Sequence, residues 1–393
     1  MTTERTKTYV IVHGGAGAHS VNSETEVKRT LRLACTQALN TENASALYLV
    51  EHAIMALEDS PLLNSGYGSN LALDGSVECD AAIMDGLTGD FGSVGAVSSM
   101  KNPIRLAHRI LQHSLLPDPL ARIPPLTLVS SGALVFAHNY NANLPSTPES
   151  DSSANAIELV PPESLVTPRA QRQWDIWKAR LDAGAPGIAA VEGALDDEDL
   201  GGELGLHALQ DTVGALAFIA APSGASGLAS GVSSGGILLK HPGRIGEAAV
   251  FGAGCWAQAA RPGKMGVACS VSGAGEYIVR VSLARLVCDA ITKDEDPDVH
   301  EILQRVLAED FWKPSRSPAN PDPSAGIILL TSEEDADARP IARLWCAFTT
   351  PSMAIAYASS ENPQGKALIL RRPKAVDSRP NDQPRIVVTG FSL

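Results

Sequence analysis

The sequence has little of what several common protein classes need. Aromatic residues make up 5% of the 393 positions, and the 31 Lys and Arg are outnumbered by 44 Asp and Glu, for a formal net charge of −13. No Lys/Arg cluster is present, which argues against a duplex nucleic-acid binder. With 44% hydrophobic and 19% charged residues, the composition is globular, and the length suffices for one large domain or two ordinary ones.

Paired cysteines and long uninterrupted apolar runs are also missing. The six cysteines lie far apart without a Cys-x-x-Cys pair, so we expect reduced core thiols of an intracellular protein, cytoplasmic or nuclear. The most apolar long segment, residues 213–232, contains Pro222 and several glycines, which favours a buried hairpin over a membrane helix. The N-terminus has only a short apolar stretch before glycines, unlike a signal peptide.

What is present forms two ordered halves separated by a loose connector. In the first half, a capping-box pattern at Ser23 precedes an apolar helical stripe, and Ser60-Pro61 ends a second helix. Predicted strands cover residues 9–13, 77–84 and 93–98, and predicted helices cover 24–38 and 43–57 and begin again at Asn102-Pro103.

The connector covers about residues 141–210. Residues 141–166 are rich in Pro, Ser, Asn and Glu and predict a mobile insert. Thr167-Pro168 opens a predicted helix that carries Trp174 and Trp177, and residues 182–210 are Gly-rich and acidic, which predicts flexibility.

The second half begins abruptly at Thr212. Predicted strands cover 212–220, 227–234, 327–331, 344–349, 353–359 and 367–370, and predicted helices cover 276–291 and 299–311. Helices mixed with hairpin-connected strands fit an α+β fold of two sheets covered by helices better than a strict βαβ series.

The hairpin after Thr212 allows a geometric prediction. If its centre lies near residues 223–224, Thr212 lies beside Ser233, Ser234 or Gly235 on the neighbouring strand. The first residue of one strand would then meet a Ser-Ser-Gly-Gly segment. The plainer interpretation is a Ser/Gly turn that closes a hairpin.

Two further segments carry chemistry-bearing residues. Arg244 stands between Gly243 and Ile245-Gly246, where little side-chain cover lets its guanidinium face a cavity and bind a carboxylate with two hydrogen bonds. Ser272 and Gly273 precede a predicted helix, where backbone N–H groups can stabilise an oxyanion. Each segment alone is equally compatible with a surface turn.

In this order and spacing the segments match one family. They are Val12–Gly17, Leu57–Pro61, Asn64–Gly66, Glu78–Gly86, Lys101–Pro103, Asp211–Ala215, Ser233–Gly236 and Gly243–Gly246. On these motifs the chain resembles the asparaginase-type N-terminal nucleophile (Ntn) hydrolases, and within them it looks most like the threonine aspartases (taspases).

The resemblance implies a four-layer αββα sandwich spanning 1–393 as one domain. It implies self-cleavage between Asp211 and Thr212 into fragments 1–211 and 212–393, which associate into an (αβ)₂ heterotetramer. By motif, Thr212 is the nucleophile, Ser234 its supporting hydroxyl and Arg244 the ligand of a substrate carboxylate. Further site positions are Asn64 in the active-site loop, Ser272 and Gly273 at the oxyanion hole, and Ser233 and Gly275 on the substrate side.

Several departures favour a taspase over a plain asparaginase. Asparaginases usually have Thr at the position of Ser234 and at that of Ser272, and Gly-Arg-x-Gly-Asp where this chain has Glu247; that Asp normally holds the amino group of a free amino acid. The long insert before Thr212 is also taspase-like. Animal taspases, however, carry a substrate-reading Lys in a stretch that is Ser-Val-Asn-Ser-Glu here, at residues 20–24.

The expected activity is a threonine endopeptidase that cleaves after aspartate in protein substrates. After self-cleavage, the free α-amine of Thr212, with a pKa of about 7.7–8.0, can take the proton from its own hydroxyl. Before cleavage that nitrogen is an amide and cannot act as a base. The alternative is an isoaspartyl peptidase or L-asparaginase on the same machinery.

Other classes fit less well. A dinucleotide-binding fingerprint would need a glycine at Ser20, and no Gly-x-Ser-x-Gly elbow for a Ser-His-Asp hydrolase is present. A non-enzymatic scaffold is disfavoured by the intact Thr212, Ser234 and Arg244. We expect no metal, nucleic-acid or membrane partner and no cofactor, apart from a monovalent ion that the loop Leu57–Gly68 could hold by family resemblance.

Overall fold

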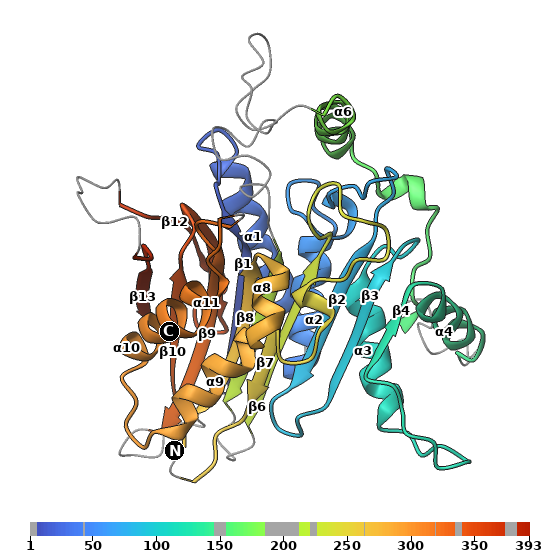
Figure 1. Ribbon diagram of the computed structural model, residues 1–393. Helices are drawn as coiled ribbons and strands as arrows, with labels where there is room; N and C mark the ends of the chain where they lie inside the picture. The colour runs from blue at the N-terminus through green and yellow to red at the C-terminus, as the bar shows by residue number, and fades with distance from the viewer. Residues whose placement is uncertain are drawn as a thin grey trace.

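The computed structural model describes residues 6–41, 44–144, 155–184, 212–220, 226–262, 264–318, 320–334, 340–373 and 383–393. Within these ranges, two β-sheets lie face to face, and helices cover the outer side of each (Figure 1). The predicted α+β sandwich of two mainly antiparallel sheets is thus confirmed.

The larger sheet has the described strand order β12-β11-β1-β5-β6-β2-β3-β4, antiparallel except for the parallel pair β3–β4. Its strands are β1 (Lys7–Gly17), β2 (Cys79–Asp85), β3 (Phe91–Val97), β4 (Thr127–Val129), β5 (Val213–Ala220), β6 (Ser226–Ser234), β11 (Ser352–Ser359) and β12 (Lys366–Arg371).

The smaller sheet has the described order β13-β10-β9-β8-β7, all antiparallel. Its strands are β7 (Cys255–Gln258), β8 (Gly266–Gly273), β9 (Ala325–Glu334), β10 (Pro340–Phe348) and β13 (Val387–Ser392). The sequence predicted β9, β10, β11 and β12, but it did not predict β4, β7, β8 or β13.

Three apolar clusters hold the four layers together. One lies between the sheets and includes Ile11, Leu216 and Ile328. The second joins the larger sheet to the helices α1 (Glu24–Leu39), α2 (Ala46–Glu58) and α3 (Pro103–Ser114). The third joins the smaller sheet to α9 (Leu283–Lys293), α10 (Val299–Arg305) and the π-helical turn η6 (Val306–Trp312), which continues into α11 (Lys313–Ser315). Burial on both faces of both sheets explains their nearly continuous apolar strands.

The predicted register of the central hairpin is confirmed. Val213 pairs with Ser233, which places the preceding residue, Thr212, opposite Ser234. The turn itself, residues 221–225, lies outside the described residues.

Local signals predicted helix positions better than helix ends. Ser23 precedes α1, but it makes no capping hydrogen bond and has helical dihedrals, so the capping box does not form. The helix predicted over 276–291 is two helices, α8 (Gly275–Val281) and α9, separated at Ser282 with φ of 49°.

The connector contains more structure than its composition predicts. The helix α4 (Ser130–Ala142), which was not predicted, overlaps its start. Further on, Ile157 and Leu165 are buried, and a short helix η2 covers Pro162–Leu165. The mobility predicted for residues 141–166 stays a prediction. The helix α6 (Pro168–Asp182), capped by Thr167, is confirmed, and the acidic stretch from 185 to Asp211 lies outside the described residues.

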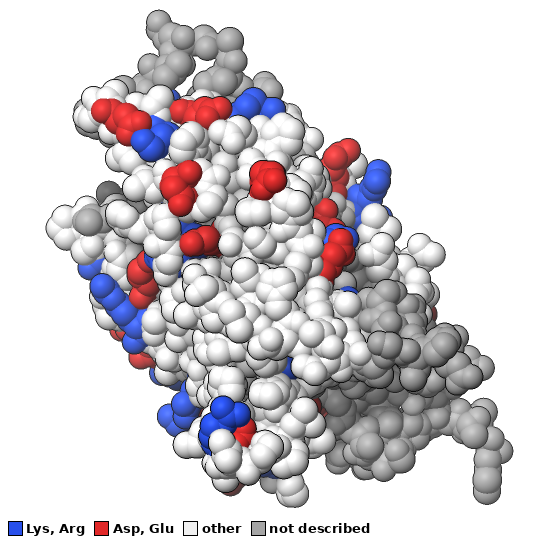
Figure 2. Space-filling model, turned by 90° about the vertical axis from the view of Figure 1, so that its right-hand side faces the viewer, with Lys and Arg blue, Asp and Glu red and all other residues white. Residues whose placement is uncertain are grey.

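Three whole-molecule observations complete the fold. All six cysteines are buried and unpaired, as predicted. No helix in the described ranges has the length and apolarity to cross a bilayer. Figure 2 faces the side of α3, β4 and α4, where few charged side chains appear near the middle. The large apolar residues exposed from the end of α3 into α4 are Leu115, Leu116, Leu120, Ile123, Leu126, Val129 and Val135.

Candidate active site

Thr212 lies where the two sheets meet, directly before β5. Its side chain is buried, with 4% of the residue exposed. The hydroxyl Oγ1 lies 3.2 Å from Ser234 Oγ and donates to Glu247 Oε1 at 2.6 Å. The hairpin register explains the first contact, because the two hydroxyls come from opposed positions on the face toward the smaller sheet. Thr212 and Ser234 are thus brought together as the sequence predicts.

Ser272 approaches Thr212 from the other sheet. Its Oγ accepts hydrogen bonds from the backbone nitrogen of Thr212 at 3.3 Å and from that of Ala16 at 3.0 Å. The nitrogen of Thr212 belongs to the peptide bond that follows Asp211, so Ser272 touches the bond predicted to break. Gly273, next along β8, has φ of 140°, and a Cβ there would lie 2.3 Å from the carbonyl oxygen of Ser324. Only glycine fits this close approach.

Glu247 is the site residue for which sequence reasoning assigned no contact. It lies in the short helix η5 (Glu247–Ala249), is 3% exposed, and donates nothing in its ionised form. Burial raises the pKa of its carboxyl, while the bond from Thr212 and the positive charge of Arg244 act against that rise. The signal that could have found it is its position three residues after Arg244.

Arg244 is less open than its glycine-flanked sequence predicts. Its side chain is only 15% exposed, and its Nε and Nη2 bind the two carboxylate oxygens of Glu276 at 2.7 and 2.5 Å. Glycines beside an arginine leave space, but here the start of α8 fills it. A substrate carboxylate must therefore displace Glu276 or share the guanidinium with it.

Gly275 allows Arg244 and Glu247 to come close to each other. A Cβ at this position would lie 2.5 Å from Glu247 Oε2 and 2.9 Å from Arg244 Nη2. A positive and a negative group therefore border the same backbone position near Thr212, which makes Gly275 part of the assembled site.

Asp80 on β2 fixes the loop that carries Arg244. Its two oxygens accept from the backbone nitrogens of Gly246 at 2.7 Å and Ala96 at 2.8 Å. Lys240 Nζ donates to the carbonyl oxygen of Arg244 at 3.2 Å. Asp80 lies in the motif Glu78–Gly86, but the sequence alone predicts no contact for it.

Asn64 makes no direct contact with Thr212 among the described hydrogen bonds. Its Nδ2 donates to the carbonyl oxygen of Gly236 at 2.8 Å, and its Oδ1 accepts from the backbone nitrogen of Asn70 at 2.8 Å. Both polar ends of the side chain are therefore occupied within its loop and the segment after Ser234. This arrangement positions the end of β6, and no hydrogen bond joins Asn64 to Thr212 among the described contacts.

Ser233 is not brought to the site with Ser234, because successive strand residues point to opposite faces. Its hydroxyl donates to Glu58 Oε1 and accepts from Ser65 Oγ, both at 2.7 Å. Burial raises the pKa of Glu58 to about 8, against hydrogen bonds from Ser233, Ile104 and Asn102. Ser233 thus ties β6 to the end of α2. The monovalent ion expected in the nearby loop stays a prediction.

His13 on β1 is a second buried group near the site. Its Nε2 lies 2.9 Å from Ser270 Oγ. A Cβ on Gly214 would lie 2.4 Å from His13 Nε2. Burial lowers the pKa of the imidazole to about 3, so it is neutral at physiological pH. His13 therefore packs and hydrogen-bonds beneath the strand that carries Thr212.

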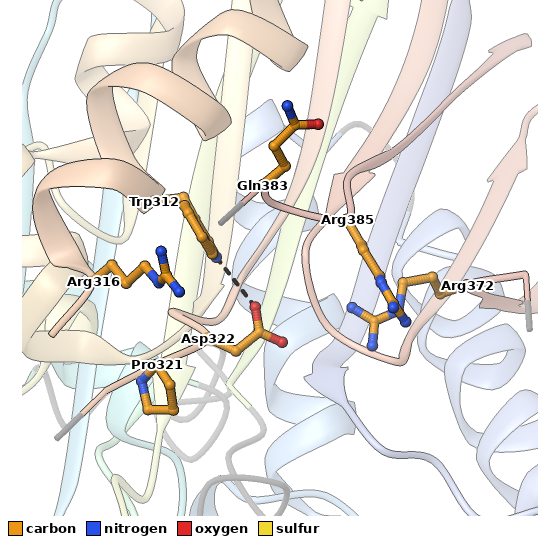
Figure 3. A pocket seen from close by; sticks show the side chains of 7 residues that line it. All are labelled: Trp312, Arg316, Pro321, Asp322, Arg372, Gln383 and Arg385. Atoms are coloured by element: carbon orange, nitrogen blue, oxygen red, sulfur yellow. Dashed lines mark hydrogen bonds between the residues drawn. The ribbon is translucent and has the colours of Figure 1, made fainter. Parts of the chain in front are cut away.

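Two surface hollows involve other residues. One, of about 370 Å³, is lined by Trp312, Asp322 and the arginines 316, 372 and 385 (Figure 3). Another, of about 580 Å³, includes Lys264, Glu295 and Glu333. None of the sequence-predicted site residues lines either hollow, and within the described ranges no cluster of three or more His, Cys, Asp or Glu is arranged to hold a metal.

The amino-acid sequence is similar to those of known proteins. The asparaginase family model matches residues 6–313. A plant-type L-asparaginase from Pyrococcus furiosus is 30% identical over 328 residues, covering 82% of this chain and 90% of the relative. Isoaspartyl peptidase/L-asparaginases from Bos taurus and Xenopus laevis are 33% and 31% identical, covering 70% and 74% of this chain and 74% and 78% of their own lengths.

The matched region contains Thr212, Ser234, Arg244, Glu247 and Ser272, and so includes the whole constellation described above. The chain therefore belongs to the asparaginase family, a family of Ntn hydrolases.

Proposed function

We propose that the chain cuts itself before Thr212 and then acts as an isoaspartyl peptidase or L-asparaginase with Thr212 as nucleophile. The observation that carries the proposal is the environment of one hydroxyl: Thr212 Oγ1 is buried and bonded to Glu247 Oε1 at 2.6 Å, with Ser234 Oγ at 3.2 Å. A threonine in an ordinary strand end needs none of these partners. A nucleophile needs an acceptor for its proton and a polar group that orients it.

The charges beside Thr212 support a substrate that carries both a carboxylate and an ammonium group. Arg244 offers the positive charge and Glu247 the negative one, on either side of the space at Gly275. Free asparagine and β-aspartyl peptides have both groups on their α-carbon, with the reactive carbonyl on the side chain. The relatives' names, L-asparaginase and isoaspartyl peptidase, describe this chemistry for those proteins.

The mature mechanism follows from the freed amine. Thr212 would use its own α-amine, with an ordinary pKa of about 7.7–8.0, to take the proton as its hydroxyl attacks the substrate carbonyl carbon. The carbon–nitrogen bond then breaks, the amine returns the proton to the leaving nitrogen, and water hydrolyses the ester on Thr212. The backbone around Ser272 and Gly273 is the expected donor region for the transient oxyanion.

A second candidate is the taspase-like endopeptidase. The sequence observation that favours it is Asp211, because the peptide bond predicted to break in the precursor itself follows an aspartate. In that case Arg244 would hold the aspartate side chain of a protein substrate.

A denaturing gel tests the shared part of both proposals. Wild-type protein is expected to give two fragments, one beginning with Thr212, whereas Thr212→Ala gives one band. Mass spectrometry of the smaller products identifies the new N-terminus. A wild-type chain that stays intact and inactive after long incubation would contradict the self-processing hydrolase.

A substrate comparison then separates the two candidates. Cleaved enzyme is assayed on L-asparagine and a β-aspartyl dipeptide, and in parallel on a peptide with an internal Gln-x-Asp-Gly sequence. Faster turnover of the small substrates supports the isoaspartyl peptidase or asparaginase. Cleavage of the internal peptide alone would establish the endopeptidase instead.

A further inference from the structure

Self-cleavage raises a chemical problem that the mature mechanism does not solve. In the uncut chain the nitrogen of Thr212 is an amide, so it cannot accept the hydroxyl proton. Self-cleavage creates the free α-amine of Thr212, so another group must act as the base during self-cleavage itself. This inference rests on the proposed self-cleavage and asks which group performs that proton transfer.

The contacts of Thr212 leave few choices among the described residues. Ser234 and Ser272 have hydroxyls, which are too weakly basic to take a proton near neutral pH. His13 directs Nε2 to Ser270, 2.9 Å away, and no hydrogen bond joins it to the Thr212 hydroxyl. Glu247 is a carboxylic residue whose Oε1 already accepts a hydrogen bond from the Thr212 hydroxyl at 2.6 Å. Its geometry satisfies the first requirement for a general base, which is hydrogen-bond contact with the proton it removes.

We propose that Glu247 is the general base of the self-cleavage step. Its carboxylate takes the proton from Thr212 as Oγ1 attacks the carbonyl carbon of Asp211. The resulting tetrahedral centre collapses with loss of the Thr212 nitrogen, which receives that proton back from the Glu247 carboxyl. An ester now joins Asp211 to the Thr212 side chain, and one water molecule hydrolyses it to the Asp211 carboxylic acid and the free hydroxyl.

Ser272 has a positioning part in the same step. Its Oγ accepts from the Thr212 nitrogen at 3.3 Å, and from Ala16 at 3.0 Å, so it ties the leaving nitrogen to both sheets. The hydroxyl and the amide of Thr212 are thereby held by different partners, Glu247 on one side and Ser272 on the other.

The surroundings of Glu247 predict how the step depends on pH. Arg244 favours its charged form, whereas burial and the negative charge of Asp80 favour the protonated form, and the balance raises its pKa. Only the carboxylate can take the proton, so the rate of self-cleavage should fall as the pH is lowered through that raised pKa and level off above it.

The test follows full-length precursor made by cell-free translation, incubated from pH 5 to pH 9 and sampled over time on a denaturing gel. Glu247→Gln keeps the size of the side chain but cannot take the proton, and it is expected to slow cleavage by about 10²-fold or more. It should also lose the fall in rate at low pH. Glu247→Asp, which keeps a carboxylate, should cleave slowly and retain that pH dependence. Thermal melting of each precursor verifies that it is folded.

Two controls keep the outcomes separate. If the wild-type chain does not cleave, the proposed function fails and this inference fails with it. If the wild type cleaves and a folded Glu247→Gln cleaves at the same rate with the same pH profile, only this inference is overturned. Loss of cleavage in Asp211→Asn with Glu247→Gln unchanged would move the base to Asp211.

Discussion

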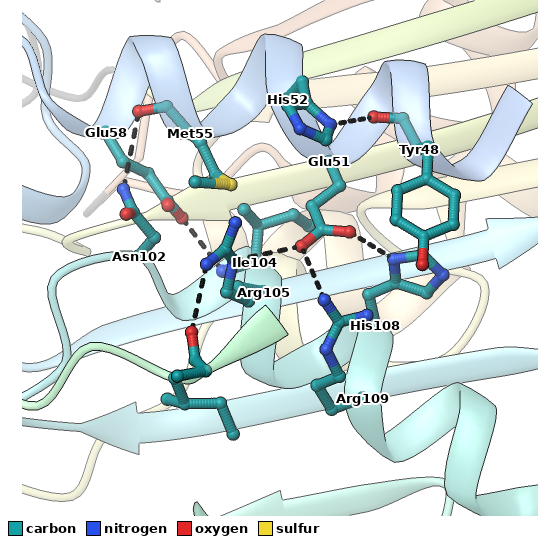
Figure 4. Close-up of polar contacts among 12 residues, drawn as sticks. Tyr48, Glu51, His52, Met55, Glu58, Asn102, Ile104, Arg105, His108 and Arg109 are labelled. Atoms are coloured by element: carbon teal, nitrogen blue, oxygen red, sulfur yellow. Dashed lines mark hydrogen bonds and ion pairs between the residues drawn. The ribbon is translucent and has the colours of Figure 1, made fainter. Parts of the chain in front are cut away.

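Two buried carboxylates in this protein meet opposite surroundings. Glu51 on α2 lies beside one histidine and two arginines: His108 Nδ1 at 2.5 Å, Arg105 Nε at 3.3 Å and Arg109 Nη2 at 3.7 Å (Figure 4). Burial alone would raise the pKa of Glu51, but these neighbours lower it below the ordinary value. Arg105 and Arg109 balance the negative charge of Glu51, and these contacts join α2 to α3.

Among the described residues, Arg244 is the cation that acts on Glu247, and its guanidinium is already bound to Glu276. Arg244 makes its two hydrogen bonds to Glu276, and Asp80 adds further negative charge. The pKa of Glu247 is accordingly raised. The comparison shows that burial alone does not make a carboxylate reactive. What distinguishes Glu247 is a shortage of positive charge together with a hydroxyl as its hydrogen-bond donor.

The largest expected effect concerns the cluster of Glu51 with His108, Arg105 and Arg109. Glu51→Ala leaves His108, Arg105 and Arg109 without their carboxylate, which should cost about 3–5 kcal/mol in the free energy of unfolding. Denaturant unfolding in a Thr212→Ala background compares single uncut chains. Because the pKa of Glu51 is lowered on folding, its contribution is present at neutral pH and is lost as the pH falls through that lowered pKa.

The matched control for Glu51 is a surface pair. Lys101 and Glu158 lie 3.1 Å apart with side chains 40% and 58% exposed, so Glu158→Ala should change stability by about 1 kcal/mol or less. Equal losses for the two variants would contradict the claim that the Glu51 cluster is structural.

The next effect concerns activity. Arg244→Ala removes the group proposed to bind the substrate carboxylate and leaves Glu247 without a nearby cation, so kcat/KM should fall about 10²-fold or more. Steady-state assays of cleaved enzyme on a β-aspartyl dipeptide measure it. Arg122→Ala, at an exposed surface pair, is the control and should match the wild type. Full activity of a cleaved Arg244→Ala enzyme would exclude the carboxylate-binding part.

The smallest expected effect is on KM and comes from releasing Arg244 from Glu276. Glu276→Gln removes the charge that occupies Arg244, so a substrate carboxylate no longer has to displace it, and KM should drop by about 3- to 5-fold. The measurement is KM and kcat determined separately. An increase in KM would mean that Glu276 orients Arg244 instead of competing for it.

Much of the site followed from the sequence because it depends on local pattern. A hairpin centred near residues 223–224 predicted the pairing that puts Thr212 opposite Ser234, and the family resemblance of the motifs predicted that Arg244 and Gly275 lie nearby. The sheet sandwich followed from the alternation of apolar strands and helices. These features repeat a short pattern that a single chain displays directly.

What the sequence did not disclose depends on contacts between distant segments. Nothing local predicts that Glu276 binds Arg244, or that Glu247 reaches the Thr212 hydroxyl across 35 positions. Ser233 and Ser234 are chemically alike, and only the strand's alternation sends one to Glu58 and the other to Thr212. Short strands such as β4 and β7 have few residues from which any periodicity could be recognised.

The strand order of the larger sheet has a consequence for the stability of the protein after the proposed self-cleavage. Strands that precede and follow Thr212 alternate across the sheet: β1 lies between β11 and β5, and β2 pairs with β6. Two fragments whose strands alternate in one sheet cannot separate without breaking the hydrogen bonds between those strands. Once unfolded, however, they would have to find each other again in solution. Self-cleavage would therefore replace the refolding of one chain by the association of two fragments. Recovery from heat would then depend on the protein concentration.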